Sequence, residues 1–281
     1  MLSQPTQPDT LTTEETAAIV ETNEAFMFRI LLTGLSPELL AEYGGASWHE
    51  VGGATAGFFE KLPHPFFNRV IGLGLHQPAT EVMIDELMGL YGRGHIPFMI
   101  SVSPAAQPAQ LTDWLLERGF RHSSNWAKVI RGTNPPPKIE TELHIEQVDE
   151  TTAGQYAAVV QIGFQMPAWT ATLYEPMAKL SNVYSYIAYA GDVPAGVGTL
   201  LVSGEWGALF NAATLPKNRR RGAQGAIMAR RIRDGISLGC RWFTTETGED
   251  TPNAPNPSYH NMIRTGFQLA YLRPNYLYDF K

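Results

Sequence analysis

The second half of the chain divides into short segments whose hydrophobic positions repeat with the period of a strand or of a helix. Runs that alternate, or that are rich in β-branched and aromatic residues, predict strands at 143–148, 183–190, 195–203, 206–215 and 241–246. The run at 206–215 is apolar almost throughout, which predicts a central strand covered on both faces. A final strand region is predicted after residue 266.

Helical periodicity separates these strands. Helices are predicted at about 151–163, 168–180 and 258–264. A longer helix is predicted after Gly222, because Met228, Ile232 and Ile236 fall on one face and Gly239 ends the pattern. The alternation of strands and helices predicts an α/β protein with a mixed sheet.

The first half follows the same order. Strands are predicted at 67–75, 96–102 and 126–132, and helices at 79–94 and 107–120. In the helix at 79–94 the inward positions are predicted to be Val82, Met83, Leu87 and Leu90. The segments WLLERGF (114–120) and NMIRTGF (261–267) occupy matching places, and their glycines lie 147 residues apart (266 − 119). We interpret this correspondence as a diverged tandem duplication.

A composition break separates the two halves. Residues 132–142 read GTNPPPKIETE, and three consecutive prolines are incompatible with a helix or a central strand. The stretch predicts an extended linker with a boundary near residue 138, and hence domains at 1–138 and 139–281.

The overall composition narrows the classes of function. The chain is 44% hydrophobic and carries a net charge of −6, which argues against disorder and against a general binder of nucleic acid or anionic membranes. Its one cysteine, Cys240, excludes a disulfide framework and a cysteine-rich zinc site, and it predicts a reducing, cytoplasmic setting and a small buried side chain. The seven histidines show no ligand spacing, so no metal is expected. No membrane span or signal peptide is evident, and the N-terminus MLSQPTQPDTLTTEE is expected to fray.

The most informative stretch is LFNAATLPKNRRRGAQGAIMARRI (209–232). Seven basic residues fall in the 17 positions from Lys217 to Arg233, with no acid among them. Three of them, Arg219, Arg220 and Arg221, directly precede a glycine that opens the predicted helix. Amides of a first helical turn lack partners, and small residues let an anion approach them. The stretch therefore predicts a phosphate or pyrophosphate site.

Other interpretations of this stretch are weaker. A P-loop and a dinucleotide fingerprint are both missing, so those nucleotide sites are not predicted. A solvated helix face that binds nothing is the ordinary explanation of a charge run, but here the run lies between a buried strand and a glycine helix start. A nucleic-acid patch is disfavoured, because no stacking aromatic residues interleave with the arginines.

The arrangement strand, Pro, arginine-rich turn, Gly, helix, strand and short helix ending in Gly-Phe resembles the GNAT superfamily of acyl-CoA N-acyltransferases. The resemblance covers about residues 143–281, and the first half looks like a degenerate copy, as in tandem-GNAT proteins. It implies two GNAT-like domains, each with a mixed, mostly antiparallel sheet and a central splayed parallel pair. In the family the motif R/Q-x-x-G-x-G/A binds the pyrophosphate of coenzyme A. Arg219, Gly222 and Gln224 occupy its positions, and Gln224 departs from the small residue expected there.

The resemblance also implies where acetyl-CoA, the cosubstrate, contacts the chain. The cofactor loop would be formed by Arg219, Arg220, Arg221, Gly222, Ala223, Gln224, Gly225 and Ala226. The end of the preceding strand, Ala212, Ala213 and Thr214, would lie along the pantetheine arm, and the thioester would sit where this strand and 241–246 splay apart. The matching loop of the first half, LHQPATEV (75–82), has neither arginine nor glycine and is predicted to bind no coenzyme A.

Catalytic groups are less well marked. The strand at 206–215 holds no carboxylate, and Met262 stands where the family has a tyrosine that protonates the thiolate. Glu246, at the carboxyl end of its strand, is the candidate general base, and Tyr259 is the candidate acid. Asn261 and Ser258 are candidate contacts to the cofactor. Trp48, Phe58 and Phe59 are candidates for a wall of the acceptor cleft.

The leading hypothesis is an acetyl-CoA-dependent N-acetyltransferase that acts on a primary amine of a small molecule or a peptide, as a monomer or a homodimer, without nucleic acid or membrane partners. A non-catalytic acyl-CoA-binding regulatory module is the rival, favoured by the missing carboxylate and by Met262. A phosphate-binding scaffold without thioester preference is the third possibility. The acceptor stays open.

Overall fold

The computed structural model describes residues 11–42 and 45–280, and it forms two compact units. The N-terminal unit comprises residues 11–128, 247–254 and 270–280, and the C-terminal unit comprises 129–246 and 255–269. This division falls about ten residues before the predicted boundary at 138, and it assigns the last strand of the chain to the N-terminal unit. The predicted linker, 132–142, forms neither a helix nor a strand. The expected fraying of the first ten residues lies outside the described residues.

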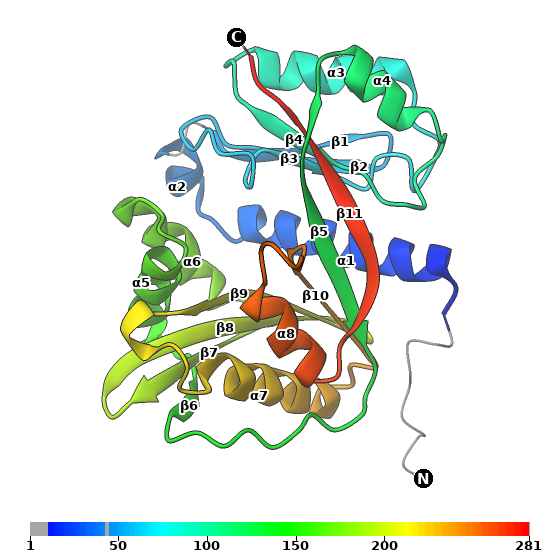
Figure 1. The fold of residues 1–281 in the computed structure, drawn as a ribbon. Coiled ribbons are helices and arrows are strands. Elements are labelled where there is room, and N and C mark those ends of the chain that lie inside the picture. The colour runs from blue at the N-terminus through cyan, green and yellow to red at the C-terminus, as the bar shows by residue number, and fades with distance from the viewer. Residues whose placement is uncertain (1–10, 43–44, 281) are drawn as a thin grey trace. The chain divides into compact units, whose positions relative to one another are not determined.

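The C-terminal unit has the predicted order of elements. It contains β6 (His144–Gln147), α5 (Ala153–Gly163), η2 (Ala168–Thr170), α6 (Ala171–Met177), β7 (Val183–Ala190), β8 (Val193–Ser203), β9 (Trp206–Thr214), η3 (Pro216–Asn218), α7 (Ala223–Ser237), β10 (Trp242–Gly248) and α8 (Pro257–Arg264). The strands lie in the order β6-β7-β8-β9-β10, antiparallel except for the parallel pair β9 and β10. Helices α5 and α6 cover one face of this sheet and α7 covers the other (Figure 1).

The N-terminal unit is also a mixed sheet between helices. It contains α1 (Thr13–Thr33), α2 (Pro37–Glu42), β1 (Ser47–Val51), β2 (Ala54–Phe58), β3 (Arg69–Ile71), α3 (Glu81–Gly92), β4 (Phe98–Ser101), α4 (Leu111–Glu117), β5 (Arg121–Arg131) and β11 (Gln268–Tyr278). The strand order is β1-β2-β3-β4-β11-β5, with a parallel pair β3 and β4. Helix α1 covers one face, and α3 and α4 cover the other (Figure 1).

The duplication predicted from the sequence is visible in matching helix ends. Gly119 after α4 has φ 89°, and Gly266 after α8 has φ 90°. The amide of Phe120 donates to Leu115 and that of Phe267 to Met262, each at 3.1 Å, and both rings enter the core of their own unit. The two Gly-Phe pairs therefore have the same structural role: a glycine with left-handed backbone ends the helix, and the following phenylalanine packs its ring into the core.

Several expectations for the first half were wrong. The strand predicted at 67–75 shortens to Arg69–Ile71, because Gly72 (φ 85°) and Gly74 (φ 83°) turn the chain. Val82, which was predicted to point inward, is 73% exposed. The side chain of Thr80 caps α3, and Ile84, Leu87 and Tyr91 form the buried face of this helix. Helices α1 and α2 and strands β1 and β2 were not predicted at all.

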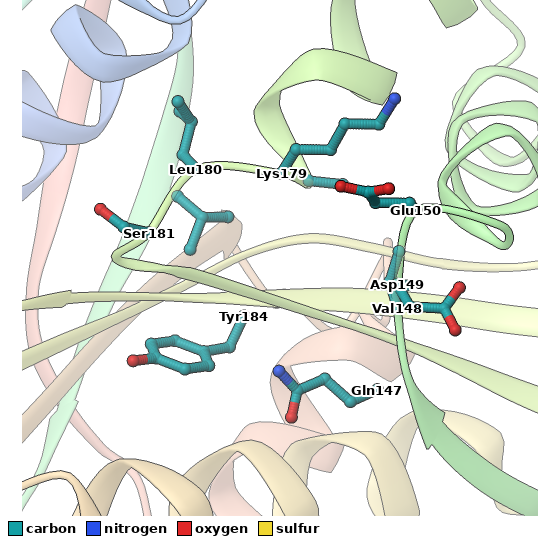
Figure 2. A pocket seen from close by; sticks show the side chains of 10 residues that line it. Gln147, Val148, Asp149, Glu150, Lys179, Leu180, Ser181 and Tyr184 are labelled. Atoms are coloured by element: carbon teal, nitrogen blue, oxygen red, sulfur yellow. The ribbon is translucent and has the colours of Figure 1, made fainter.

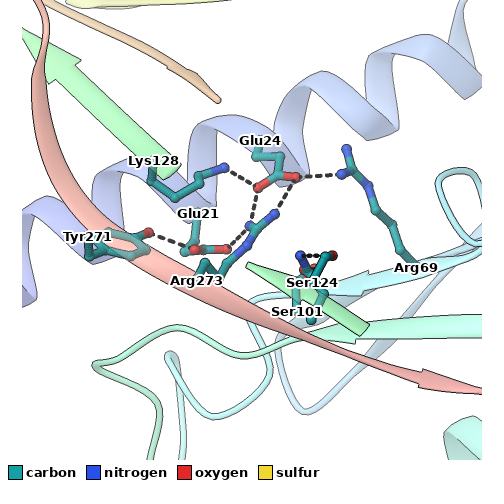
Figure 3. Close-up of polar contacts among 9 residues, drawn as sticks. Glu21, Glu24, Arg69, Ser101, Ser124, Lys128, Tyr271 and Arg273 are labelled. Carbon is teal, nitrogen blue, oxygen red and sulfur yellow. Dashed lines mark hydrogen bonds and ion pairs between the residues drawn. The ribbon is translucent and has the colours of Figure 1, made fainter. Parts of the chain in front are cut away.

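Buried charges attach α1 to its sheet (Figure 3). Glu21 and Glu24 of α1 are almost completely buried. Their partners come from β3, β5 and β11: Arg69, Lys128, Tyr271 and Arg273. The distances are 3.0 Å from Arg69 to Glu24, 2.6 Å from Lys128 to Glu24 and 2.8 Å from Arg273 to Glu21. Burial by itself raises the pKa of Glu24, but the charges of Arg273, Lys128 and Arg69 outweigh it and hold the pKa well below 4.5.

Candidate functional site

The start of α7 is open to an anion. Pro216 ends β9, η3 follows, and Gly222 takes a left-handed φ of 82° at the N-cap without any side-chain cap. The first helical bond runs from the amide of Ala226 to the carbonyl of Gly222 at 3.0 Å. Within the described part of the chain, the amides of Ala223, Gln224 and Gly225 have no acceptor. These amides and the helix dipole together favour a negatively charged ligand.

Basic side chains surround this helix start. Lys217, Arg219, Arg220 and Arg221 are all exposed. Arg221 donates from Nη1 to Oδ1 of Asn218 at 3.3 Å, and its carbonyl accepts a 2.6 Å bond from the Thr141 hydroxyl. Asn218 is only 6% exposed, and its buried Nδ2 has no acceptor among the described residues. The loop is thus held at Arg221 by bonds with Thr141 and Asn218, while its basic side chains stay exposed.

Two residues of the basic stretch have other roles. Arg231 is 1% exposed and donates to main-chain carbonyls of β8 and β9, so it is not part of the anion-binding surface. Arg230 bonds Asp234 one turn along α7, at 2.8 Å. Fewer than seven basic side chains are therefore available to an anion. The sequence did not reveal this, because periodicity alone does not identify a buried arginine.

Gln224 turns its side chain away from the open amides. Its Nε2 donates to the carbonyl of Ala213 at 2.8 Å and to the hydroxyl of Thr214 at 2.9 Å. This departure from the motif thus bonds the first turn of α7 to the end of β9. The side chain of Ala213 is covered by α5, because a Cβ on Gly163 would lie only 2.4 Å from it, whereas Ala212 is exposed.

Strands β9 and β10 separate as predicted. Their parallel register holds only for Trp206 to Ala208 opposite Trp242 to Thr244. One further link follows, a 2.8 Å bond from the Thr245 hydroxyl to the carbonyl of Leu209, although β9 continues to Thr214 and β10 to Gly248. The ends of the two strands therefore have no ladder between them.

The candidate catalytic residues lie on the elements beyond this separation. Glu246 is half-buried on β10, two residues after Thr244, where the register with β9 ends. Tyr259 is half-buried on α8, where its ring packs against the core of the C-terminal unit, and among the described residues its hydroxyl has no hydrogen-bond partner. Asn261 accepts a 3.0 Å bond from Arg264 of the same helix, and Ser258 is exposed. Phe59, a candidate wall residue, is wholly buried against Phe28 and Phe67, which excludes that role.

Sequence reasoning missed a polar chain behind β9. Asn211, with a left-handed φ of 48°, donates from Nδ2 to the Tyr156 hydroxyl at 3.3 Å. Tyr156 bonds the hydroxyl of Thr199, which lies 3.0 Å from that of Ser185. Asn256, the N-cap of α8, was also missed, although an Asn before a Pro at a helix start is a readable capping signal. No pattern in the sequence indicates the polar chain, because its members come from four elements.

The corresponding helix start of the N-terminal unit is closed. The hydroxyl of Thr80 caps α3 by accepting from the amide of Met83, and Glu81 adds a negative charge to the first turn. Both features disfavour an anion there. The prediction that this unit binds no coenzyme A gains a physical reason, although it stays a prediction.

A cavity of about 250 Å³ lies elsewhere in the C-terminal unit. Figure 2 shows Val148, Asp149 and Glu150 on one side and Lys179, Leu180 and Ser181 on the other. Asp149 is occupied in the turn before α5, since its carboxylate accepts bonds from the amides of Thr151 and Thr152, which lower its pKa. None of the predicted site residues lines this cavity, and its side chains suggest no chemistry.

Two features of the described residues bear on the expected partners. No helix in residues 11–42 and 45–280 combines the length and the hydropathy needed to cross a membrane. Over the same residues, no three His, Cys, Asp or Glu side chains lie close enough together to hold a metal ion. Cys240 is buried, and burial raises the pKa of its thiol to about 11.

Comparisons with known proteins identify the fold. No family model matches the sequence, and no curated protein is significantly similar to it in sequence. A GCN5-related N-acetyltransferase from Kribbella flavida is 12% identical and has a TM-score of 0.61, over 92% of this chain and 95% of that one. One from Sphaerobacter thermophilus is 13% identical, with a TM-score of 0.59 over 86% and 84%. A tandem GNAT protein from the clavulanic acid biosynthesis pathway, solved without acetyl-CoA, is 14% identical, with a TM-score of 0.57 over 82% and 81%. The chain therefore has the tandem GNAT fold, as the sequence predicted.

Proposed function

We propose that the chain is an acetyl-CoA-dependent N-acetyltransferase and that its C-terminal unit binds the cosubstrate. The observation that carries the proposal is the open start of α7, where three amides without acceptors meet four exposed basic side chains next to two separating strands. An open helix start alone would suit any anion. A gap between strands beside it suits a ligand with a phosphate end and an extended arm, which is the shape of an acyl-coenzyme A.

Each part of the site then contacts a different part of the cosubstrate. Arg219, Arg220 and Arg221 and the open amides of Ala223, Gln224 and Gly225 hold the pyrophosphate. Gln224 contributes its amide, while its side chain keeps the end of β9 against α7. Ala212 and Thr214 line the pantetheine arm, and the side chain of Ala213 packs inward. The amide nitrogen of Asn261 is the group left to contact the cofactor, because its oxygen bonds Arg264.

The chemistry needs a neutral amine, an electrophilic thioester and two proton transfers. The amine nitrogen attacks the carbonyl carbon, the carbon–sulfur bond breaks, and the products are an amide and a thiol. Glu246 is the proposed acceptor of the amine proton, directly or through water. Tyr259 is the proposed donor to the departing sulfur, a role for which its hydroxyl is suited because no described residue bonds it. Holding both substrates in one orientation supplies much of the remaining rate.

Calorimetry tests the binding step. Acetyl-CoA should bind saturably to the wild type, and Arg221→Glu should weaken binding at least tenfold, because it replaces an attraction for pyrophosphate with a repulsion. Arg93→Glu, the same charge change at an exposed position in the N-terminal unit, is the matched control and should bind like the wild type. Absence of saturable binding, or equal affinities of the wild type and Arg221→Glu, would refute the proposal. Equal affinity for pyrophosphate and acetyl-CoA would favour a phosphate scaffold.

A non-catalytic acyl-CoA sensor is the second candidate. It is favoured by β9, which carries no carboxylate, and by Met262, which is buried in the core where the family has a tyrosine. Release of free thiol from acetyl-CoA, measured over a panel of amines, separates the two functions. The transferase predicts release that depends on an acceptor and falls at least tenfold in Glu246→Gln. Tight binding without such release would establish the sensor.

A further inference from the structure

Strand β9 carries a bulge at the point where it leaves β10. In its pairing with β8, Val197 lies opposite Ala213 and Thr199 lies opposite Phe210. Two residues of β9, Asn211 and Ala212, therefore oppose the single residue Gly198. An extra residue of this kind bends a strand and redirects its peptide groups. Asn211 takes up the bend with its left-handed φ of 48°.

Arg231 of α7 occupies the opening that the bulge leaves between β8 and β9. Its Nη1 donates to the carbonyl of Thr199 at 2.9 Å and to that of Phe210 at 3.3 Å, one from each strand. Gly198 makes room for it, because a Cβ there would lie 2.9 Å from the guanidinium carbon. The bulge and the arginine therefore fit one another and require a glycine between them.

Side chains on the opposite face of the sheet contact the same bulge. The side chain of Asn211 donates to the Tyr156 hydroxyl, and Tyr156 bonds Thr199, the partner of Phe210. The left-handed conformation of Asn211 is thus fixed from both α5 and α7. Strained backbone of this kind persists only where its surroundings determine it, and it is typical of functional sites.

The burial of the charged Arg231 side chain at this bulge carries a desolvation cost. It is 1% exposed, forms no ion pair with any described residue, and has a buried Nε without an acceptor among them. Burial lowers its pKa to about 10, so it is still a cation at neutral pH. Buried charges are often replaceable by apolar side chains without loss of stability, which argues that the charge itself has a use.

The charge of Arg231 lies next to the peptide group that joins Phe210 and Asn211, and the direction of this group indicates what the charge does. The carbonyl and the N–H of a trans peptide point in opposite directions, and the bond between Phe210 and Asn211 is trans. Because the Phe210 carbonyl points to Arg231, the Asn211 N–H points away from β8, toward the side of β10. On that side the last link between the strands is the bond from Thr245 to Leu209. The amide of Asn211 is therefore the first one beyond the separation. A cation on its carbonyl polarises this peptide and strengthens the N–H as a donor.

On the basis of the proposed function, we propose that Arg231 is a positioning residue for acyl transfer: it fixes the β9 bulge and polarises the peptide whose Asn211 N–H binds the thioester carbonyl oxygen. When the amine attacks, that oxygen gains negative charge, and a fixed donor stabilises it. Arg231 itself touches neither substrate.

The experiment compares acetyl-CoA with its S-ethyl analogue, in which CH₂ replaces the carbonyl, by calorimetry. The wild type should bind acetyl-CoA about fivefold more tightly, the effect of one net hydrogen bond. Arg231→Met keeps length without charge and should reduce this preference to below about twofold, with an unchanged affinity for coenzyme A itself. Arg233→Met, on the exposed side of the same helix, should behave like the wild type. Infrared spectra of bound, isotope-labelled acetyl-CoA should show a lower carbonyl frequency in the wild type than in Arg231→Met.

A measurement on the wild type serves if Arg231→Met does not fold. Exchange of the Asn211 amide hydrogen should be slowed by acetyl-CoA and much less by the S-ethyl analogue. Equal protection by both ligands, or an unchanged preference and carbonyl frequency in Arg231→Met, would overturn the role of Arg231 and leave the proposed function intact. Absence of coenzyme A binding by the wild type would overturn both.

Discussion

Glu24 is the shared ion-pair partner of three buried cations inside the N-terminal unit. Arg69, Lys128 and Arg273 all contact its carboxylate, and all three side chains are nearly inaccessible to solvent (Figure 3). Loss of one partner leaves the others desolvated with a net charge, which costs far more than a surface pair would. The stability of α1 on its sheet is therefore expected to depend on this residue and on its ionisation.

The replacement Glu24→Gln tests this expectation. It should lower the free energy of unfolding at pH 7 by about 3–5 kcal/mol, as when one partner of a buried ion pair is removed. Because the folded pKa of Glu24 lies well below 4.5, its contribution is complete above that pH and is lost as the pH falls through the folded pKa. Urea unfolding at several pH values should show a steeper loss of stability below about pH 4.5 in the wild type than in Glu24→Gln.

Glu14→Gln is the matched control, since Glu14 is an exposed glutamate of the same helix. It should change the unfolding free energy by no more than about 0.5 kcal/mol. Parallel pH curves for the wild type and Glu24→Gln would show that the charge of Glu24 does not stabilise the fold.

Single residues also mark the limit of what the sequence reveals. Arg221 and Arg231 lie ten positions apart in one basic stretch, yet one is exposed in a loop and the other is almost completely buried. The distinction depends on Gly198, in a different strand, which leaves the space for the guanidinium. A pairing of this kind depends on packing between elements, which local sequence patterns do not carry.

At the scale of elements, the start of α7 depends on the backbone of Gly222. An alanine there would have to adopt φ 82°, and its Cβ would lie 3.2 Å from that of Thr141. Gly222→Ala should therefore lower the unfolding free energy by about 1–2 kcal/mol, the cost of a left-handed conformation for a residue with a side chain. Denaturant unfolding measures it.

Gly225→Ala provides the comparison within the same turn. Gly225 lies inside α7, and a Cβ there would meet only Ile139, at an ordinary contact distance of 3.4 Å. Alanine is the better helix former, so this variant should be more stable than the wild type by about 0.5–1 kcal/mol. Equal effects of the two substitutions would contradict the assignment of Gly222 as the left-handed N-cap.

Elements differ in how well the sequence predicts them. Every strand and α-helix of the C-terminal unit was predicted, because turn residues separate apolar segments of clear period, whereas the short helix η3 was not. Helix α1 was missed although it has 21 residues, since its buried face includes Thr16, Glu21, Asn23 and Glu24 and so lacks a hydrophobic stripe. The separation of β9 and β10 came from the family resemblance, whereas the bulge at Asn211 could not be predicted, because it depends on Arg231 and Tyr156 in two other elements.

At the scale of the whole molecule, the two units share a plan and differ in one charged feature. Each contains a parallel strand pair joined by a helix, with β3, α3 and β4 in one unit and β9, α7 and β10 in the other. The helix starts are opposite in character: α3 is capped by Thr80 and carries Glu81, whereas α7 is uncapped and preceded by three arginines. The two units therefore share a frame, and of these two helix starts that of α7 is the uncapped and basic one.

This asymmetry predicts a stoichiometry. Titration calorimetry should find about one acetyl-CoA per chain, since of the two corresponding helix starts that of α7 combines open amides with positive charge, whereas that of α3 is capped. Arg221→Glu should weaken this single isotherm at least tenfold and reveal no second site of undiminished affinity, because the hydroxyl of Thr80 already caps the start of α3. Thermal unfolding gives an independent readout, because a ligand that binds only the native state raises the melting temperature as its concentration rises. Two equivalents per chain, or a site of undiminished affinity beside the weakened one in Arg221→Glu, would mean that the N-terminal unit retains a cosubstrate site despite its capped helix.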